Sequence, residues 1–181
     1  MGEVAEIKRG ASPRPISSPK WFNNESKIGW VRISDVSKSN KYLEKTLQYL
    51  SDKGVQKSRL VKPGNMIMSI CATIGKPIYT NFETCIHDGF VVFKNPKIGK
   101  EYLYYFLQKI QNRWYRYGQP GTQVNLNIDI VSNEKIPYPT LPEQKKIANF
   151  LSSIDKAIEN IANQIEQSHE WKKGLLQRMF V

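Results

Sequence analysis

The side chains best able to do chemistry in this sequence are amides and cations rather than catalytic nucleophiles. Residues 118–127 combine two glycines, a proline and several amides, a composition typical of an exposed loop. Amides displayed on a loop can form hydrogen bonds with the edges of bases, and arginines or apolar groups in a groove can also discriminate bases. One tryptophan is a candidate wedge or stacking group, although a core position is an equally good interpretation. The predicted base-reading residues are Trp21, Arg32, Thr122, Gln123 and Asn125.

A second set of side chains is suited to holding DNA phosphates. Basic groups bind phosphate oxygens and fix the register of a protein on the duplex. The candidates come from stretches rich in Gly, Pro, Ser or Asn, where side chains are expected to be exposed. A single lysine is more often only a solvated charge, so the prediction applies to the set. The set is Lys8, Arg9, Arg14, Lys20, Lys38, Lys41 and Lys76.

The net charge supports a polyanionic partner. It is +11 at pH 7, and residues 1–142 carry +10 of it, from 21 basic and 11 acidic side chains. Such a field favours nucleic acid, because each neutralised phosphate releases counterions. General solubility or an acidic protein partner would explain the charge as well, so charge alone leaves the partner open.

Motifs for catalysis and cofactors are weak. Gly75-Lys76 is followed by proline and lacks the leading glycine of a Walker loop. His87 and Asp88 lie near Cys85, but the partners of a catalytic triad usually meet in space rather than in sequence. The two cysteines, residues 71 and 85, are predicted to be reduced and mostly buried, with no metal bound. Glu143 and Lys145 resemble the end of a metal-dependent nuclease motif, although an acid in a first helical turn already has a capping role.

The elements that must position these residues predict an α+β fold. Residues 29–34 alternate like a half-buried strand, and residues 65–70, 76–79 and 89–93 are typical of buried strands. Residues 101–114 place apolar side chains at helical spacing, so a helix is expected to pack on the β-rich body. The prolines of residues 136–142 end this body. The predicted domains are therefore 1–140 and 141–181.

The second segment predicts one long helix. Thr140 can cap it, with Pro142 and Glu143 in its first turn. Apolar residues then recur at alternating steps of four and three, the spacing of a coiled-coil seam. A helix to Met179 would extend about 57 Å, so much of the seam is expected to need a partner helix rather than its own domain. Ser168 and Lys172 interrupt the seam, whose apolar members are Ile147, Leu151, Ile154, Ile158, Ile161, Ile165, Leu175 and Met179.

Several motifs resemble the specificity subunit of Type I restriction-modification systems. The longest match is Leu141–Ile158, which is similar to the opening of that family's spacer helix. Gly2–Gly10 is similar to the start of a target recognition domain. Other similar segments follow in the family's order at Trp30–Val36, Gly64–Ser69, Thr73–Lys76 and Gly121–Leu126. The similar segments span nearly the whole chain.

The resemblance implies a non-catalytic subunit that binds double-stranded DNA in a sequence-specific way. In this family two recognition domains are joined by two antiparallel helices, and each domain reads half of a split target. The chemistry would belong to partners: methylation to modification subunits that use S-adenosylmethionine, and ATP-driven translocation and cleavage to a restriction subunit, with ATP and Mg²⁺ bound there. This chain is expected to bind none of these cofactors.

The chain departs from the family pattern because it holds one recognition domain and one helix. It is therefore a natural or engineered half-subunit, or a fragment. A half-subunit could pair its helix with a second copy as a homodimer, and two-fold symmetry would then require an inverted-repeat target with a non-specific gap.

Two other functions remain open, a small metal-dependent DNA nuclease and a coiled-coil adaptor without DNA binding. No run approaches the roughly 18 apolar residues of a membrane span, and residues 1–6 lack the character of a signal peptide. The expected location is the cytoplasm.

Overall fold

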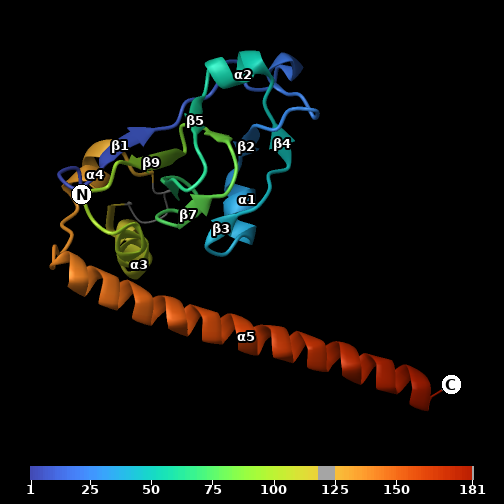
Figure 1. Ribbon diagram of the computed structural model, residues 1–181. Helices are drawn as coiled ribbons and strands as arrows, with labels where there is room; N and C mark the ends of the chain where they lie inside the picture. The colour runs from blue at the N-terminus through green and yellow to red at the C-terminus, as the bar shows by residue number, and fades with distance from the viewer. Residues whose placement is uncertain (118–124, 181) are drawn as a thin grey trace. The chain divides into compact units, whose positions relative to one another are not determined.

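The structure is a computed structural model that describes residues 1–117 and 125–180. It contains two compact units, Met1–Tyr138 and Pro139–Val181. The first unit holds two β-sheets and several short helices, and the second contains a single long helix (Figure 1). The predicted α+β class, with a β-rich body and a long C-terminal helix, is confirmed.

The first unit is built from short strands and mostly short helices. The strands are β1 (Glu6–Arg9), β2 (Gly29–Val31), β3 (Tyr42–Leu43), β4 (Gln48–Tyr49), β5 (Arg59–Val61), β6 (Met66–Ser69), β7 (Pro77–Thr80), β8 (Thr84–Ile86) and β9 (Phe90–Lys94). The helices are η1 (Pro19–Trp21), α1 (Ile33–Lys38), α2 (Asp52–Gln56), α3 (Lys100–Ile110), η2 (Gln111–Tyr117), α4 (Ile128–Asn133) and, in the second unit, α5 (Leu141–Met179).

The strands form two sheets. One has five strands in the order β1-β9-β6-β7-β3, and the other has four in the order β4-β2-β8-β5. β6 and β7 are buried at every position and β9 at all but its last, which explains why their sequences are continuous apolar runs. The strands predicted at 65–70, 76–79 and 89–93 correspond to β6, β7 and β9. β8 and β9 are consecutive but belong to different sheets, so the turn between them joins the two.

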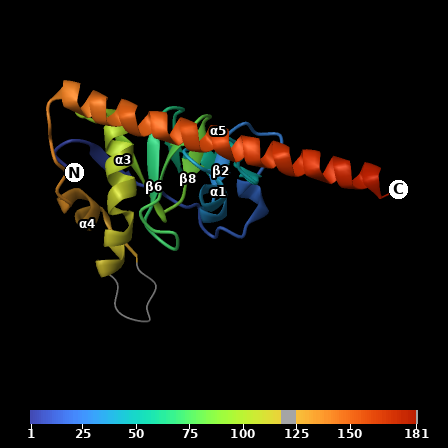
Figure 2. The same ribbon diagram turned by 90° about the horizontal axis from the view of Figure 1, so that it is seen from below.

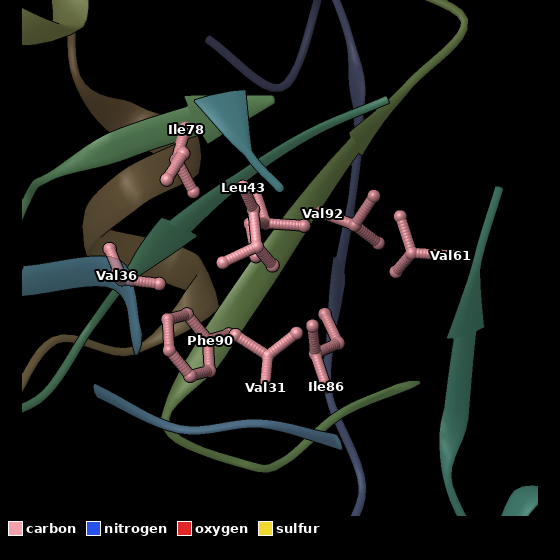
Figure 3. Close-up of a cluster of buried hydrophobic side chains, with 9 residues drawn as sticks. Val31, Val36, Leu43, Val61, Ile78, Ile86, Phe90 and Val92 are labelled. Atoms are coloured by element: carbon pink, nitrogen blue, oxygen red, sulfur yellow. The ribbon is translucent and has the colours of Figure 1, made fainter. Parts of the chain in front are cut away.

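The main core gathers residues from both sheets. Figure 3 shows that side chains from β2, β5 and β8 of the smaller sheet meet those from β3, β7 and β9 of the larger one, together with Val36 of α1. Trp30, Leu50 and Cys85 form a smaller cluster. Each fully buried aliphatic or aromatic side chain of this kind contributes about 1.5–3 kcal/mol through the hydrophobic effect. This packing holds the two sheets rigidly around the turn that joins them.

The strand expected at residues 29–34 is shorter than predicted. β2 ends at Val31 and is buried throughout, so it does not alternate. Helix α1 follows immediately, because the carboxylate of Asp35 accepts a hydrogen bond from the backbone N–H of Arg32 at 2.9 Å and starts a turn there. A local cap therefore overrides the alternating pattern.

The helix expected at 101–114 also ends earlier. α3 stops at Ile110 and continues as the 3₁₀-helix η2. α3 packs against β7. Figure 2 shows the helix α3 from the side. Trp114 of η2 is fully buried against Gly75, where a Cβ would lie 2.1 Å from Cδ1 of the indole. Gly75 also has a φ of +74°, so both the backbone and the close approach require glycine there.

Helix α5 is 39 residues long and begins at Leu141, with Thr140 as its cap as predicted. The carboxylate of Glu143 accepts hydrogen bonds from the backbone N–H of Thr140 at 2.9 Å and from its hydroxyl at 2.7 Å. These bonds lower the pKa of Glu143. At 1.5 Å per residue the helix extends about 58 Å. Within the described residues, no helix has both the length and the apolar character needed to cross a membrane.

Candidate nucleic-acid interface

The turn between β8 and β9 holds the segment that follows β1. Gly10 donates its N–H to the carbonyl of Phe90 at 2.9 Å, and Ala11 donates to the carbonyl of Ile86 at 3.0 Å. The backbones approach so closely that a Cβ on Gly10 would lie 2.0 Å from the carbonyl oxygen of His87. Glycine is required because any side chain would overlap this backbone. Residues 9–12 are thereby fixed against the turn.

Asp88, in this turn, contacts two of the predicted phosphate-binding residues. Its Oδ1 accepts a hydrogen bond from the hydroxyl of Ser12 at 2.6 Å, and Arg14 lies 3.5 Å from its Oδ2. Its backbone carbonyl accepts a hydrogen bond from Nε of Arg9 at 2.6 Å. The hydrogen bond from Ser12 is the main cause that lowers the pKa of Asp88, so this carboxylate is charged at neutral pH.

Strand β1 lies at the edge of its sheet beside β9 and adds further cations (Figure 1). Lys8 forms an ion pair with Glu6 at 2.7 Å, and Lys94 of β9 lies opposite Glu6. The hydrogen bond from Lys8 is the main cause that lowers the pKa of Glu6, and the charges of Lys94 and Arg59 lower it further. We call the cations of β1, of the segment that follows it and of the neighbouring strands β9 and β5 the basic strip: Lys8, Arg9, Arg14, Arg59 and Lys94.

Arg59 and Lys94 belong to the strip but are not among the residues predicted from the sequence. Arg59 donates from Nε to the carbonyl of Arg9 at 3.1 Å across a separation of 50 residues. Lys94 reaches the strip through the antiparallel pairing of β9 with β1. No local motif marks either residue, because only the tertiary fold brings them to β1.

A second group of candidate residues meets at the loop between β6 and β7. The hydroxyl of Thr73 lies 3.1 Å from that of Ser37 in α1. Leu126 donates its N–H to the carbonyl of Ile70 at 2.8 Å, which fixes the exposed Asn125 beside this loop. We call these the loop residues: Ser37, Thr73 and Asn125. Thr122 and Gln123 lie outside the described residues.

The loop between β6 and β7 lies beside the turn between β8 and β9. Ile70 donates its N–H to the carbonyl of Gly89 at 2.8 Å, and Sγ of Cys71 lies 3.7 Å from the same oxygen. The charges of Asp88 and Arg9 both act on the pKa of Cys71, which burial raises. The loop after β6 and the turn after β8 are therefore neighbours in the fold.

Two of the predicted phosphate contacts have structural roles instead. Nζ of Lys76 donates to the carbonyls of Ser37 at 3.2 Å and Ser39 at 2.7 Å, at the C-terminal end of α1. Burial lowers the pKa of Lys76. Lys41 is paired with Glu101, which leaves its charge neutralised within the fold. Lys38 is exposed at the end of α1 and suits phosphate contact better.

The remaining candidates are held by neighbouring side chains. Trp21 is buried, and its indole donates to the carbonyl of Pro15 at 2.9 Å. It offers no face for stacking in this arrangement, so we leave it out of the interface. The ammonium of Lys20 lies 4.3 Å from the centre of the Trp21 ring. Arg32 donates from Nε to Gln48 at 2.8 Å, which fixes the direction of its guanidinium.

Helix η2 presents a mixed basic and aromatic surface that sequence analysis did not select. Arg113, Tyr115, Arg116 and Tyr117 are exposed there, while Arg116 also pairs at 2.8 Å with the buried Glu134. The alternation of cations with tyrosines in this segment is a signal that could have identified it.

The residues considered for catalysis do not form an active site. Cys85 is fully buried, and burial raises its pKa to about 12. Nδ1 of His87 accepts a hydrogen bond from the N–H of Gly89 at 2.9 Å, and burial lowers the pKa of this imidazole. The carboxylate of Glu143 is taken by Thr140 at the helix cap. In the part of the chain that the structure describes, no three His, Cys, Asp or Glu side chains are grouped to hold a metal ion.

The predicted seam of α5 is largely exposed within this chain. Ile158, Ile161 and Ile165 are 54–61% exposed, and Ile147, Ile154, Leu175 and Met179 are also exposed. Leu151 is half-buried. Residues with so much apolar surface in one row are typical of a helix that has a partner.

Comparison with known families gives one match over most of the chain. Residues 1–167 match the model of the "Type I restriction modification DNA specificity domain". Curated relatives come from Methanocaldococcus jannaschii. The Type I restriction enzyme MjaVIII specificity subunit is 38% identical over 88 residues, which cover 48% of this chain and 20% of that protein. The putative MjaX specificity subunit is 31% identical and covers 87% of this chain and 40% of its own length.

Solved structures share the fold. A chain described under "complex assembly and conformational transition of the type I R-M system" matches with a TM-score of 0.74 at 22% identity, covering 95% of this chain and 41% of that one. The HsdS subunit from Thermoanaerobacter tengcongensis matches with a TM-score of 0.68 at 22% identity, covering 87% of this chain and 36% of that one. This chain therefore spans about two-fifths or less of the length of these relatives.

Proposed function

We propose that this chain, which belongs to the family of Type I restriction modification DNA specificity domains, binds double-stranded DNA and reads one part of a target sequence. The match over residues 1–167 carries the proposal. The basic strip supports it on physical grounds, because five cations gathered around β1 suit the phosphates of a duplex. The net charge of +11 adds a favourable long-range field.

The basic strip and the loop residues would have different roles in binding. The basic strip would hold phosphates and set the register of the chain on the duplex. Lys38, which follows Ser37 in the sequence, would add another phosphate contact. Arg32 and the loop residues would approach base edges, together with Thr122 and Gln123 of the adjoining segment. The loop residues Ser37, Thr73 and Asn125 carry hydroxyl and amide groups, which can both donate and accept hydrogen bonds. This arrangement favours recognition without chemistry.

In this role the chain would direct partner subunits to the target site and would not itself modify or cleave DNA. Modification subunits would supply S-adenosylmethionine-dependent methylation, and a restriction subunit would supply ATP- and Mg²⁺-dependent translocation and cleavage. Such a complex would work in the cytoplasm, where the DNA lies. Under this proposal the chain contributes the contacts that choose the site.

We further propose that α5 pairs with the same helix of a second copy. The seam residues are exposed along the helix, and burying a row of Ile and Leu side chains would stabilise a pair. A two-fold pair would present two recognition surfaces to one duplex, so its target would be an inverted repeat with a gap. The length of α5 would set that gap.

The test is the salt dependence of DNA binding. The full chain is titrated into a fluorescent duplex of about 30 base pairs of random sequence, at several salt concentrations. If the five cations of the strip all contact phosphates, the log–log slope of affinity against salt should be about −4 to −5. A flat slope contradicts DNA binding. Oligomers without DNA binding would favour the adaptor, and Mg²⁺-dependent nicking lost in Glu143→Ala would favour the nuclease.

A further inference from the structure

Asp88 is an acidic residue among the cations of the basic strip. A carboxylate at a surface that binds phosphates repels them, and this repulsion weakens binding. Its presence among Arg9, Arg14 and Arg59 therefore calls for a compensating role. The contacts of Asp88 with its neighbours indicate what that role is.

Asp88 contacts two arginines through two different groups. Its backbone carbonyl accepts the hydrogen bond from Nε of Arg9 at 2.6 Å, and its carboxylate lies 3.5 Å from Nη2 of Arg14. Ser12 fixes the carboxylate itself through a hydrogen bond of 2.6 Å. Since Gly10 and Ala11 bind the same turn through their backbones, Asp88 belongs to a rigid support.

The arginines keep donors for a second acceptor. Arg9 uses Nε for Asp88, and its two Nη groups form no other hydrogen bond or ion pair within the described part of the chain. The side chain of Arg14 is 82% exposed, so most of its guanidinium faces solvent. A guanidinium has five N–H donors in a planar fork, so one edge can be held while the other binds a phosphate.

We propose that the carboxylate of Asp88 is a positioning group that orients Arg14 toward the phosphates of the target duplex, beside Arg9, which the backbone carbonyl of the same residue holds, and so increases discrimination between target and random DNA. This inference rests on the proposed function. An arginine held in one direction suits one register of the duplex, whereas a freely moving arginine contacts any phosphate within reach. Asp88 therefore weakens random binding through its charge and strengthens target binding through orientation.

This role predicts effects of opposite sign on the two kinds of DNA. In Asp88→Asn the carboxylate charge is lost, so the affinity for random duplex should rise. The side chain no longer forms an ion pair with Arg14, so the affinity for the target should fall by about tenfold. The ratio of the two affinities is the decisive quantity, because charge removal alone raises both affinities together.

The experiment uses the full chain and two duplexes. One is a random-sequence duplex, and the other is a duplex enriched by the wild-type chain from a random library. Glu25→Gln is the matched control, because Glu25 is exposed and loses the same charge away from the strip. Ser12→Ala is the second variant, since it removes the hydrogen bond to Oδ1 and keeps the charge. Thermal melting of each variant shows whether it folds.

The expected result is a fall of the target-to-random ratio in both Asp88→Asn and Ser12→Ala, with the ratio unchanged in Glu25→Gln. For Asp88→Asn the salt slope on the target should also become less steep by about 1, since one phosphate contact is lost. If Asp88→Asn does not fold, Ser12→Ala alone decides. An unchanged ratio in folded variants overturns the positioning role, whereas a wild-type chain that binds no duplex overturns the proposed function.

Discussion

The Nε of Arg59 donates a hydrogen bond to the backbone carbonyl of Arg9 at 3.1 Å. This contact joins β5 of the smaller sheet to β1 of the larger one, and it adds Arg59 to the basic strip. We expect Arg59→Gln to weaken binding of all duplexes alike and to make the salt slope less steep by about 1. Fluorescence anisotropy at several salt concentrations measures both. An unchanged or steeper slope would contradict the position of Arg59 in the strip.

Lys76→Met should destabilise the fold without changing the salt dependence of DNA binding. Lys76 donates to two carbonyls at the end of α1, so its loss should lower the free energy of unfolding by about 1 kcal/mol. The melting temperature should fall by about 2–4 °C. The salt slope of DNA binding should stay within error of the wild type, because this ammonium is engaged inside the fold. If the salt slope of Lys76→Met changed as much as that of Arg59→Gln, Lys76 would be a phosphate contact after all.

The close approach of Gly10 to His87 predicts a large effect of one methyl group. In Gly10→Ala the Cβ would meet a carbonyl oxygen at 2.0 Å, and neither backbone can move without breaking hydrogen bonds. We expect a loss of about 2–3 kcal/mol in the free energy of unfolding. Gly174→Ala is the control, because a Cβ there would meet no atom within 4 Å beyond its chain neighbours and the backbone of its own helix. In the helix interior this second change should stabilise α5 by about 0.5–1 kcal/mol. Chemical denaturation of both variants measures the difference.

The sequence predicted the buried strands and the long helix well, because their patterns are local. β6, β7 and β9 are apolar runs, and Thr140 with Glu143 forms a capping box that starts α5. The same local reasoning failed at Arg32, where the hydrogen bond from its N–H to Asp35 ends a strand and starts a helix. A capping hydrogen bond between residues three positions apart determines the local structure there, in spite of the alternating pattern.

The candidate site could be predicted only in part, since most of its contacts cross between distant segments. Arg9 and Arg14 are close in the sequence, whereas Lys94 joins them through the pairing of β9 with β1, and Arg59 joins them through a side-chain hydrogen bond from the other sheet. Composition could not show which lysines form hydrogen bonds or ion pairs within the fold. Lys76 caps a helix formed 38 or more residues earlier in the chain, and no motif in its own neighbourhood indicates that partner.

The cap of α5 gives a prediction for pH. Thr140 lowers the pKa of Glu143 through two hydrogen bonds, so titration of this carboxyl followed by NMR should have its midpoint below the ordinary value of a glutamate. Because the folded pKa is lowered, the cap stabilises the helix fully above the unfolded pKa. That contribution is lost as the pH falls through the folded value. Thr140→Ala should move the midpoint part of the way back, since the backbone N–H still donates. An unchanged midpoint would contradict the hydroxyl contact.

The seam of α5 predicts the oligomeric state. Ile158 and Ile161 are neighbouring seam positions and are both more than half exposed in the single chain. In a helix pair they would be buried, so Ile158→Asp with Ile161→Asp would place four carboxylates in one apolar interface and separate the two copies. The control is Asn160→Asp with Asn163→Asp, which adds the same charge outside the seam. Sedimentation equilibrium should give a monomer for the first variant and the wild-type dimer for the second. An equal mass for both variants would show that the helix pairs through another face or remains single.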